Sequence, residues 1–396
     1  MQGRYYMNNR SLQMLFFDIA FCAYIFCFAI GQSDAISLLR LTSPLLLLSK
    51  TFSVAAFLCS GRKQIMYVVL FIIVISIAQY LKIEYKYEVV AKCLLVFAGL
   101  NISVNHILKV SFYSILLSLL FILITILVGL NEDYILQRGI VVKGLIAHTM
   151  GFRHYSGFSF RVVGLTFMFM YINRKSLTAV KFAIIILANV AVMCFSLTRL
   201  HVICSSLMII FAFFIYKKKV FIPYNSILKY CSFIIFPATA LFYIALGSFS
   251  ILTGTNIFDW WDENFSGRML FTLQAFENYG IKAWGNMIEM TGTRTASAGR
   301  GIENFYIDSG YAYWILAYGY IFTFFIIAAY STVLYKCYKN KEFYLYMITI
   351  ICSISNLIND FFNFVEAFPV LFLVFANFKP HPLQDLIKKK VSTISK

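Results

Sequence analysis

The chain has 396 residues, of which 61% are hydrophobic and only 13% are charged, and its mean hydropathy is +0.78. This composition excludes a water-soluble globular protein of this length. A transmembrane helix needs about 20 apolar residues, because its backbone N–H and C=O groups must pair with each other in hydrocarbon. We therefore expect an all-α, polytopic integral membrane protein in which residues 1–396 form a single transmembrane domain.

The apolar runs predict about twelve membrane spans. The first run follows "MQGRYYMNNR", contains Asp18 and has no small-residue cleavage site, so it predicts a retained anchor rather than a signal peptide. The expected spans are roughly 12–30, 35–58, 65–80, 89–105, 110–130, 158–172, 179–197, 200–216, 228–249, 310–334, 343–359 and 363–378.

Cationic connections predict the orientation. The segments "GRK" (61–63), "NRKSLTAVK" (173–181), "YKKK" (216–219), "YKCYKNK" (335–341) and "DLIKKK" (385–390) fall on one side, which the positive-inside rule makes cytoplasmic. Both termini are then expected inside. The net charge of +17 is therefore an orientation signal, and no nucleic-acid partner is implied.

Cysteines and intramembrane cations have ordinary explanations. The nine cysteines lie in or beside the spans in no metal-ligand spacing, so we expect small core side chains and no disulfide framework. Arg40 and Lys50 share one expected span. They either extend to the interface or pair with Asp18, or they guide a lipid phosphate into a cavity from the side.

Two longer segments are expected on the outer side, 131–157 and 250–309. The second opens with "TGTNIFDWWDENFSGR" and continues through the amphipathic "MLFTLQAFENYGIKAWGNMIEM". A loop of about 60 residues in a compact protein is usually functional or disordered, and its aromatic residues and helical spacing favour a function.

All four tryptophans (260, 261, 284 and 314) lie in this loop or at the start of the following span. An interfacial aromatic belt explains such residues. The alternative is a sugar-binding platform, because an aromatic face presents apolar surface to a pyranose ring. Trp284, Tyr306 and Tyr311 are the candidates for that platform.

Arginine and lysine are distributed differently across the membrane. Most of the lysines are expected in the cytoplasm, whereas seven of the 12 arginines are expected outside: Arg138, Arg153, Arg161, Arg199, Arg268, Arg294 and Arg300. A requirement for topology alone would place both residue types inside. The planar guanidinium fork binds phosphate or carboxylate through two hydrogen bonds and stays charged in dry surroundings. The outer face is therefore expected to bind an anionic ligand.

Arg199 is the first candidate for this anion site, because "MCFSLTRLHVICSS" places it in a very short turn between two apolar runs. A charge near the membrane needs a partner, which is either a lipid head group or a bound phosphate. Arg161 in "SGFSFRVVG" and Arg268 in "SGRML" would complete the pocket. Arg153, Arg294 and Arg300 are further candidates, of which the last two lie in a small-residue stretch that tolerates arginine freely.

Candidate proton acceptors are few. His154 and His201 are expected outside, and either is a general base or a structural histidine. Glu303 and Asp308 flank the return into the membrane, where a carboxylate either accepts a hydroxyl proton or pairs with an arginine. The sequence contains no nucleotide-binding, zinc-protease or serine-hydrolase motif, and neither a metal site nor a cofactor is expected.

These features together resemble the O-antigen and capsule repeat-unit polymerases of bacteria, the Wzy family, which is similar in plan to the O-antigen ligases. The resemblance rests on "FRVVGL" (160–165), "SLTRL" (196–200), "SGRMLFTLQAF" (266–276) and "NFYIDSGYAYWILAYGYIF" (304–322). It implies a metal-independent glycosyltransferase of the bacterial plasma membrane. Its substrates are oligosaccharide repeats linked through pyrophosphate to undecaprenol, and a chain-length regulator and a flippase act in the same pathway.

The resemblance also implies roles for individual residues. Arg199 and Arg268 would hold the pyrophosphate and Arg161 would assist them. Asp308 or Glu303 would orient or deprotonate the acceptor hydroxyl, with His154 or His201 as the alternatives. Ligase relatives commonly carry a histidine near the end of the large loop, and this chain has none between 202 and 380, which favours a polymerase.

A ligase and a lipid-linked oligosaccharide flippase remain as alternatives. A flippase is expected to have polar residues from many spans and two related halves. In this chain the polar chemistry gathers on one face, and the halves show no evident similarity. A ligase would transfer the glycan to a different acceptor.

Overall fold

The computed structural model describes residues 2–33, 35–61, 65–83, 86–133, 135–137, 146–154, 156–219, 226–253, 268–290, 305–357, 359–360, 365 and 367–378. Its elements follow in the order α1 (Gln2–Gly31), η1 (Ile36–Leu41), α2 (Thr42–Cys59), α3 (Ile65–Gln79), α4 (Lys86–Ala98), α5 (Val104–Leu127), β1 (Ile135–Gln137), β2 (Ile146–His148), α6 (Ser156–Ile172), α7 (Ala179–Ser196), α8 (Arg199–Ala212), η2 (Phe213–Lys217), α9 (Ser226–Thr253), α11 (Arg268–Tyr279), α13 (Gly310–Tyr313), η3 (Trp314–Tyr318), α14 (Gly319–Lys339), α15 (Phe343–Ser355) and η5 (Pro369–Leu373).

Six of the described helices are long and apolar enough to cross a membrane: Asn9–Gly31, Ser37–Cys59, Val104–Leu127, Ala179–Ser196, Arg199–Lys217 and Gly310–Lys339. Four shorter apolar helices accompany them: Ile65–Gln79, Ser156–Ile172, Ser226–Phe242 and Phe343–Ser355. The helical, membrane-embedded character expected from the sequence is therefore confirmed, whereas the number of twelve spans stays a prediction. Many side chains on these helices are apolar and exposed, as lipid-facing residues are.

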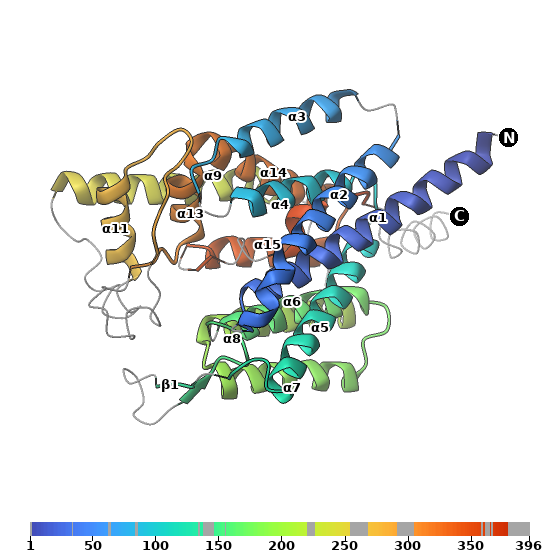
Figure 1. The fold of residues 1–396 in the computed structure, drawn as a ribbon, viewed down its shortest axis with the longest axis horizontal. Helices are drawn as coiled ribbons and strands as arrows, with labels where there is room; N and C mark the ends of the chain where they lie inside the picture. Colours follow the sequence, from blue (N-terminus) through green and yellow to red (C-terminus); the bar gives the residue numbers. More distant parts are fainter. Residues whose placement is uncertain are drawn as a thin grey trace.

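The helices form a bundle in which α1 packs along α2 and against α5, and α6 packs against α5, α7 and α8 (Figure 1). Helix α14 packs against α9 and α15. The helix α11 and the strand β1 lie at one end of the bundle, and the N-terminal end of α1 lies at the other (Figure 1). We name the first of these the α11 end.

Both segments that were expected outside lie in part at the α11 end. Within 131–157, β1 and β2 pair as an antiparallel hairpin with Ile135 opposite His148. Within 250–309, α9 continues to Thr253 and α11 is a helix, as the amphipathic pattern predicts. Residues 254–267 and 291–304 lie outside the described part of the chain, so the large loop as a whole stays a prediction.

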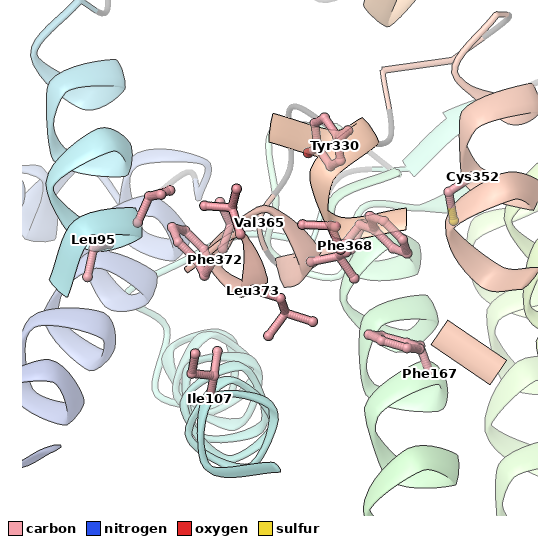
Figure 2. Close-up of a cluster of buried hydrophobic side chains, with 14 of the residues drawn as sticks. Leu95, Ile107, Phe167, Tyr330, Cys352, Val365, Phe368, Phe372 and Leu373 are labelled. Carbon is pink, nitrogen blue, oxygen red and sulfur yellow. The ribbon is translucent and has the colours of Figure 1, made fainter. Parts of the chain in front are cut away.

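A short segment near the C-terminus differs from the expected span 363–378. Instead of a long helix it contains the short 3₁₀ helix η5, which begins at Pro369. Figure 2 shows Phe368, Phe372 and Leu373 of this segment between Leu95, Ile107 and Phe167, which belong to α4, α5 and α6. Proline has no N–H and fixes its own φ, which favours a short helical start over a continuous span.

The backbone of this buried segment is paired with the turn between α4 and α5. Asn377 donates to the carbonyl of Ile102 (2.8 Å), and its own carbonyl accepts from Val104 N–H (3.2 Å). Asn101 donates to the carbonyl of Phe375 (3.1 Å). Irregular backbone is stable at membrane depth only when protein covers it and satisfies its polar groups. This pairing also ends α4 at Ala98, so that the expected span 89–105 is a shorter helix followed by a turn.

Among the intramembrane charges, Asp18 pairs with a histidine rather than with Arg40 or Lys50. Asp18 is bound to His106, with 2.8 Å between Oδ1 and Nε2. Arg40 is exposed in η1, and the Lys50 ammonium lies 5.0 Å from the ring centroid of Tyr87. Asp18 therefore pairs across α1 and α5, and Lys50 contacts α4.

Helix α14 is continuous with α13 only through a π-helical segment, η3. The carbonyl of Leu316 accepts hydrogen bonds from both N–H groups of Asn286, the backbone N (2.9 Å) and Nδ2 (2.9 Å). Tyr320 N–H in turn donates to the carbonyl of Lys282 (3.2 Å). A π segment disturbs the regular hydrogen-bond ladder of the helix, and the non-helical residues 282–286 bond to backbone groups that it leaves open.

Gly285 allows this close approach, and Gly280 provides a comparison. Gly285 has φ +74° and a Cβ there would collide with the carbonyl of Ala317. Gly280 has a similar φ of +63°, but a Cβ at Gly280 would meet no atom within 4 Å. We expect Gly280→Ala to cost about 1–2 kcal/mol through backbone strain alone, and Gly285→Ala to cost clearly more because it also separates residues 282–286 from η3. Thermal unfolding of the two variants in detergent measures this difference, and equal losses would contradict the packing described.

A buried carboxyl group lies at the turn between α14 and α15. Glu342 is 5% exposed, and burial raises its pKa to about 7, although Arg174 and a hydrogen bond with Tyr171 act in the opposite direction. The Arg174 guanidinium lies 4.0 Å from the ring centroid of Tyr171 and donates from NH1 to that residue's carbonyl (2.9 Å). These contacts fasten the end of α6 to the α14–α15 turn.

The raised pKa predicts a pH-dependent stability. Below the ordinary glutamate pKa, Glu342 is protonated in the folded and the unfolded chain, and the stabilisation is fully present. Between that value and about pH 7 only the unfolded chain releases the proton, so stability falls as pH rises and is lowest above the folded-state pKa. We expect Glu342→Gln to be about 3 kcal/mol more stable than the wild type at pH 8 and nearly equal at pH 4.

Thermal unfolding between pH 4 and pH 8 tests this expectation. The exposed Glu277 on α11 provides the matched control, because Glu277→Gln removes the same charge without a burial effect. A wild-type protein whose stability rises over this range relative to Glu342→Gln would show that the carboxyl group is held ionised by Arg174.

Candidate functional site

The beginnings of α6 and α8 lie together at the α11 end and bring Ser159 and His201 into contact. Ser159 Oγ lies 2.5 Å from His201 Nδ1, and Ser159 is fully buried while His201 is 2% exposed. The ring of Phe160 covers the imidazole, with 4.3 Å between the centroids. On the other side of the imidazole, Asn359 Nδ2 lies 3.3 Å from His201 Nε2.

The directions of these hydrogen bonds assign the histidine tautomer. Ser159 donates its only hydroxyl proton to the carbonyl of Ser156 (2.9 Å), so it accepts from His201 Nδ1–H. The oxygen of the Asn359 amide accepts from the N–H of Asp360 (2.7 Å), which turns its NH₂ group toward Nε2. This pattern fits the tautomer with its proton on Nδ1, in which the Nε2 lone pair accepts from the Asn359 amide.

Arg161 lies on the same helix two residues after Ser159 and is completely buried. Its NH1 and NH2 both approach Gln32 Oε1 at 3.2 Å, and NH1 also donates to the carbonyl of Gly157 (2.8 Å). The guanidinium stacks over Phe152, 4.2 Å from the ring centroid. These contacts fix the guanidinium fork in place within a buried region.

The chain segment before α13 joins the site from a different part of the sequence. Gly310 N–H approaches the carbonyls of Asn356 (3.1 Å) and Asn359 (3.3 Å), so Asp308 lies near the residue that contacts His201. A Cβ at Gly310 would collide with the Asn356 side chain, so only glycine permits this approach. Asp308 is partly exposed, and its Oδ2 is out of contact with solvent.

Arg199 is placed by the turn that joins α7 to α8. Leu197 ends α7 in the left-handed conformation (φ 52°, ψ 31°), and Arg199 is the first residue of α8. Its side chain is exposed, and His201 follows two residues later. The short turn expected from "SLTRL" thus places an exposed guanidinium two residues before the buried imidazole on the same helix.

Arg153 and His154 lie at the edge of this cluster, where Arg153 N–H donates to the carbonyl of Gln32 (2.8 Å). Arg153 is exposed and its Nε donates to the carbonyl of Ser33 (3.2 Å). His154 is exposed, and its Nδ1 lies 2.6 Å from Ser156 Oγ at the start of α6. These contacts hold residues 153 and 154, which precede α6, against the residues that follow α1.

The three aromatic candidates for a sugar platform occupy different surroundings. Tyr311 is fully buried, and its hydroxyl lies 2.6 Å from Ser353 Oγ, so its ring offers no face to a sugar in this conformation. Tyr306 is partly buried with its ring 5.1 Å from that of Phe271 on α11. Trp284 lies 5.6 Å from Tyr80 at the end of α3.

The remaining candidates cannot be placed. Glu303, Arg294 and Arg300 lie outside the described residues, as does Arg138. Arg268 is the first residue of α11, and only its backbone is described. Among the described residues, no group of three His, Cys, Asp or Glu side chains is arranged to hold a metal ion.

Sequence reasoning missed the polar residues that hold the site together: Gln32, Ser159, Asn356 and Asn359. Ser159 stood in the quoted segment "SGFSFRVVG", where a serine on an apolar helix is unremarkable. The stronger signal was "NLIND" (356–360), a group of amide and carboxyl side chains at the end of an apolar run. Buried amides need hydrogen-bond partners, so this group indicated a polar site.

The described cluster combines an imidazole with guanidinium groups at the beginnings of α6 and α8. His201 offers a lone pair, Arg161 and Arg199 offer guanidinium groups, and Asp308 offers a carboxylate from the opposite segment. Such an arrangement suits acid–base catalysis on a substrate that carries or develops negative charge. No family model, curated protein or solved structure matches this chain.

Proposed function

We propose that the chain is a membrane glycosyltransferase that joins polyprenyl-pyrophosphate-linked oligosaccharide repeats at the outer leaflet of a bacterial plasma membrane. The observation that carries the proposal is the contact between α6 and α8 at the α11 end, where Ser159, two residues before the buried Arg161, meets the buried imidazole of His201. The likeness of four sequence segments to repeat-unit polymerases, which include Arg161, Arg199 and Asp308, supports the same reaction class.

The proposed reaction is a substitution at the anomeric carbon of the growing chain. A hydroxyl oxygen of the incoming repeat forms the new glycosidic bond, and the bond from the anomeric carbon to the pyrophosphate oxygen breaks. The hydroxyl proton passes to His201 Nε2 once the Asn359 amide has released its hydrogen bond to that nitrogen, and the pyrophosphate leaves with the bonding electron pair. Fixed guanidinium groups stabilise that developing charge without having to reorganise, which is the largest effect available to such a site.

The distribution of charges supports the proposed orientation. The α14–α15 turn carries Lys339 and Lys341, and the end of α8–η2 carries Lys217 and Lys218, whereas Arg161 and Arg199 begin α6 and α8. The positive-inside rule makes the lysine-rich end cytoplasmic. The candidate site then faces the outer leaflet, where lipid-linked glycans are presented for assembly.

Incubation of the purified protein with a defined undecaprenyl-pyrophosphate-linked repeat tests the proposal. A polymerase produces a ladder of longer chains that remain linked to undecaprenol, and it releases undecaprenyl pyrophosphate. A ligase consumes the same substrate only when a different acceptor is added. Transport of the unchanged lipid across a vesicle membrane, without a ladder, would reject the transferase assignment.

A further inference from the structure

An apolar groove of about 370 Å³ runs between α3 and α4 on one side and η3 and α14 on the other, with η5 at its floor. The volume lies at the lower end of the range for ligand sites. Its rim on α14 includes Phe324, Ala328 and Thr332, which are exposed on the face that meets lipid. The groove is therefore open to the hydrocarbon of a membrane.

The lining changes in polarity along the groove. Lys92 is its charged lining residue, and its ammonium lies 3.1 Å from Glu88 Oε1, one turn nearer the start of α4. Tyr24 donates to the same Glu88 oxygen (3.2 Å), which anchors this pair to α1. Beyond Lys92 the walls are apolar and include Phe97 and Phe375. A ligand with a polar end at Lys92 and a hydrocarbon chain beyond it matches this gradient.

The polar end of the groove adjoins the candidate site. Tyr318 lines the groove, and its ring centroid lies 5.4 Å from that of Tyr313 in α13. Gly310, which begins α13, donates to the carbonyl of Asn359 (3.3 Å), whose side chain contacts His201. One short path therefore joins the groove, the start of α13 and the imidazole.

We propose that this groove binds the isoprenoid chain of the lipid-linked substrate, with the phosphate-bearing end toward Lys92 and the candidate site. The proposal rests on the proposed function for the identity of the lipid. A mobile chain in bulk lipid would present its head group at many depths and angles. Seating the first part of the chain in a fixed groove orients the pyrophosphate relative to His201 and Arg161, which is the entropic advantage of a preorganised site.

Variants that fill the groove without disturbing the core test the proposal. Ala328→Phe and Thr332→Trp each place a ring at an exposed rim position, and Ala183→Phe makes the first change at an exposed position of α7, outside the groove. The probe is undecaprenyl phosphate in nanodiscs of phosphatidylglycerol, and the number of bound molecules is read by native mass spectrometry. We expect both groove variants to bind undecaprenyl phosphate at least about tenfold more weakly, and Ala183→Phe to bind as the wild type does.

Undiminished binding by both groove variants overturns the proposal, as does displacement of undecaprenyl phosphate by phosphatidylglycerol, which would make the groove a general lipid site. Elongation assays test the enzyme assignment independently of the lipid-binding result. If the wild-type protein elongates lipid-linked repeats and the groove variants bind and elongate normally, the groove proposal is rejected and the transferase assignment is kept. If the groove variants weaken lipid binding but the wild-type protein forms no ladder, the groove proposal is kept and the transferase assignment is rejected.

Discussion

Replacement of His201 by alanine is expected to slow chain elongation by about 10²- to 10⁴-fold, the range for loss of a general base. The reason lies in its hydrogen bonds, because Ser159 at Nδ1 and Asn359 at Nε2 fix the orientation of the imidazole. The measurement is the rate at which a defined lipid-linked repeat is converted into longer chains. Protein yield and unfolding temperature are followed in parallel, since a buried side chain is being removed.

His154 provides the matched control. It is expected on the same side of the membrane, but its side chain is exposed and bonded to Ser156 at the start of its own helix. His154→Ala should therefore elongate at nearly the wild-type rate. A normal elongation rate in His201→Ala, combined with a large loss of rate in His154→Ala, would identify His154 as the general base. It would reject the assignment of that role to His201.

Ser159 is a positioning residue, so its removal should act on the histidine rather than on the reaction. Ser159→Ala leaves Nδ1–H without its acceptor and frees the ring to adopt the other tautomer. We expect a smaller loss of rate than in His201→Ala, accompanied by a change in the pH dependence of elongation. Ser159→Thr, which keeps the hydroxyl, should restore the wild-type pH profile, whereas a merely structural serine would leave that profile unchanged in both variants.

Hydropathy was sufficient to predict the helical, membrane-embedded character of the chain, because spans in hydrocarbon must satisfy their own backbone. It failed at residues 367–378, where an equally apolar segment contains only a short 3₁₀ helix. Protein covers this segment on its sides, and the α4–α5 turn satisfies part of its backbone. An apolar run indicates burial, but only its hydrogen-bond partners distinguish a lipid-facing helix from a covered irregular segment, and those partners are distant in sequence.

The charged and imidazole side chains of the candidate site could be predicted from the sequence, but the polar residues that bind them could not. Arg161, Arg199 and His201 stand out because cations and imidazoles are rare in apolar runs. Gln32 and Asn359 lie 129 and 158 residues from the groups that they contact, so only the folded chain brings them together. Tyr311 illustrates the opposite error, since an aromatic residue beside a functional loop serves the core equally well.

Substitution of the arginines is the second change that is expected to lower the elongation rate strongly. Arg199→Ala is expected to lower the elongation rate by about 10²- to 10³-fold, as the loss of one preorganised donor to a developing oxyanion does, while the unfolding temperature changes little because the side chain is exposed. Arg161→Ala is expected to lower the rate and the stability together, because its removal leaves a buried cavity and takes a donor from Gln32. Arg268→Ala is expected to act as Arg199→Ala does.

Lysine substitutions separate charge from geometry. Lysine keeps the positive charge but offers a compact ammonium without the fork, so Arg199→Lys and Arg161→Lys should recover little of the lost rate. Arg153→Ala is the control, since Arg153 is an exposed arginine at the same end whose Nε is bonded to a backbone carbonyl. If the site acts only by attracting anions to the surface, lysine will restore activity at low ionic strength and Arg153→Ala will weaken it. If the fork stabilises the leaving pyrophosphate, the lysine variants will stay slow at every salt concentration, because a misplaced charge cannot be corrected by raising the local concentration of substrate.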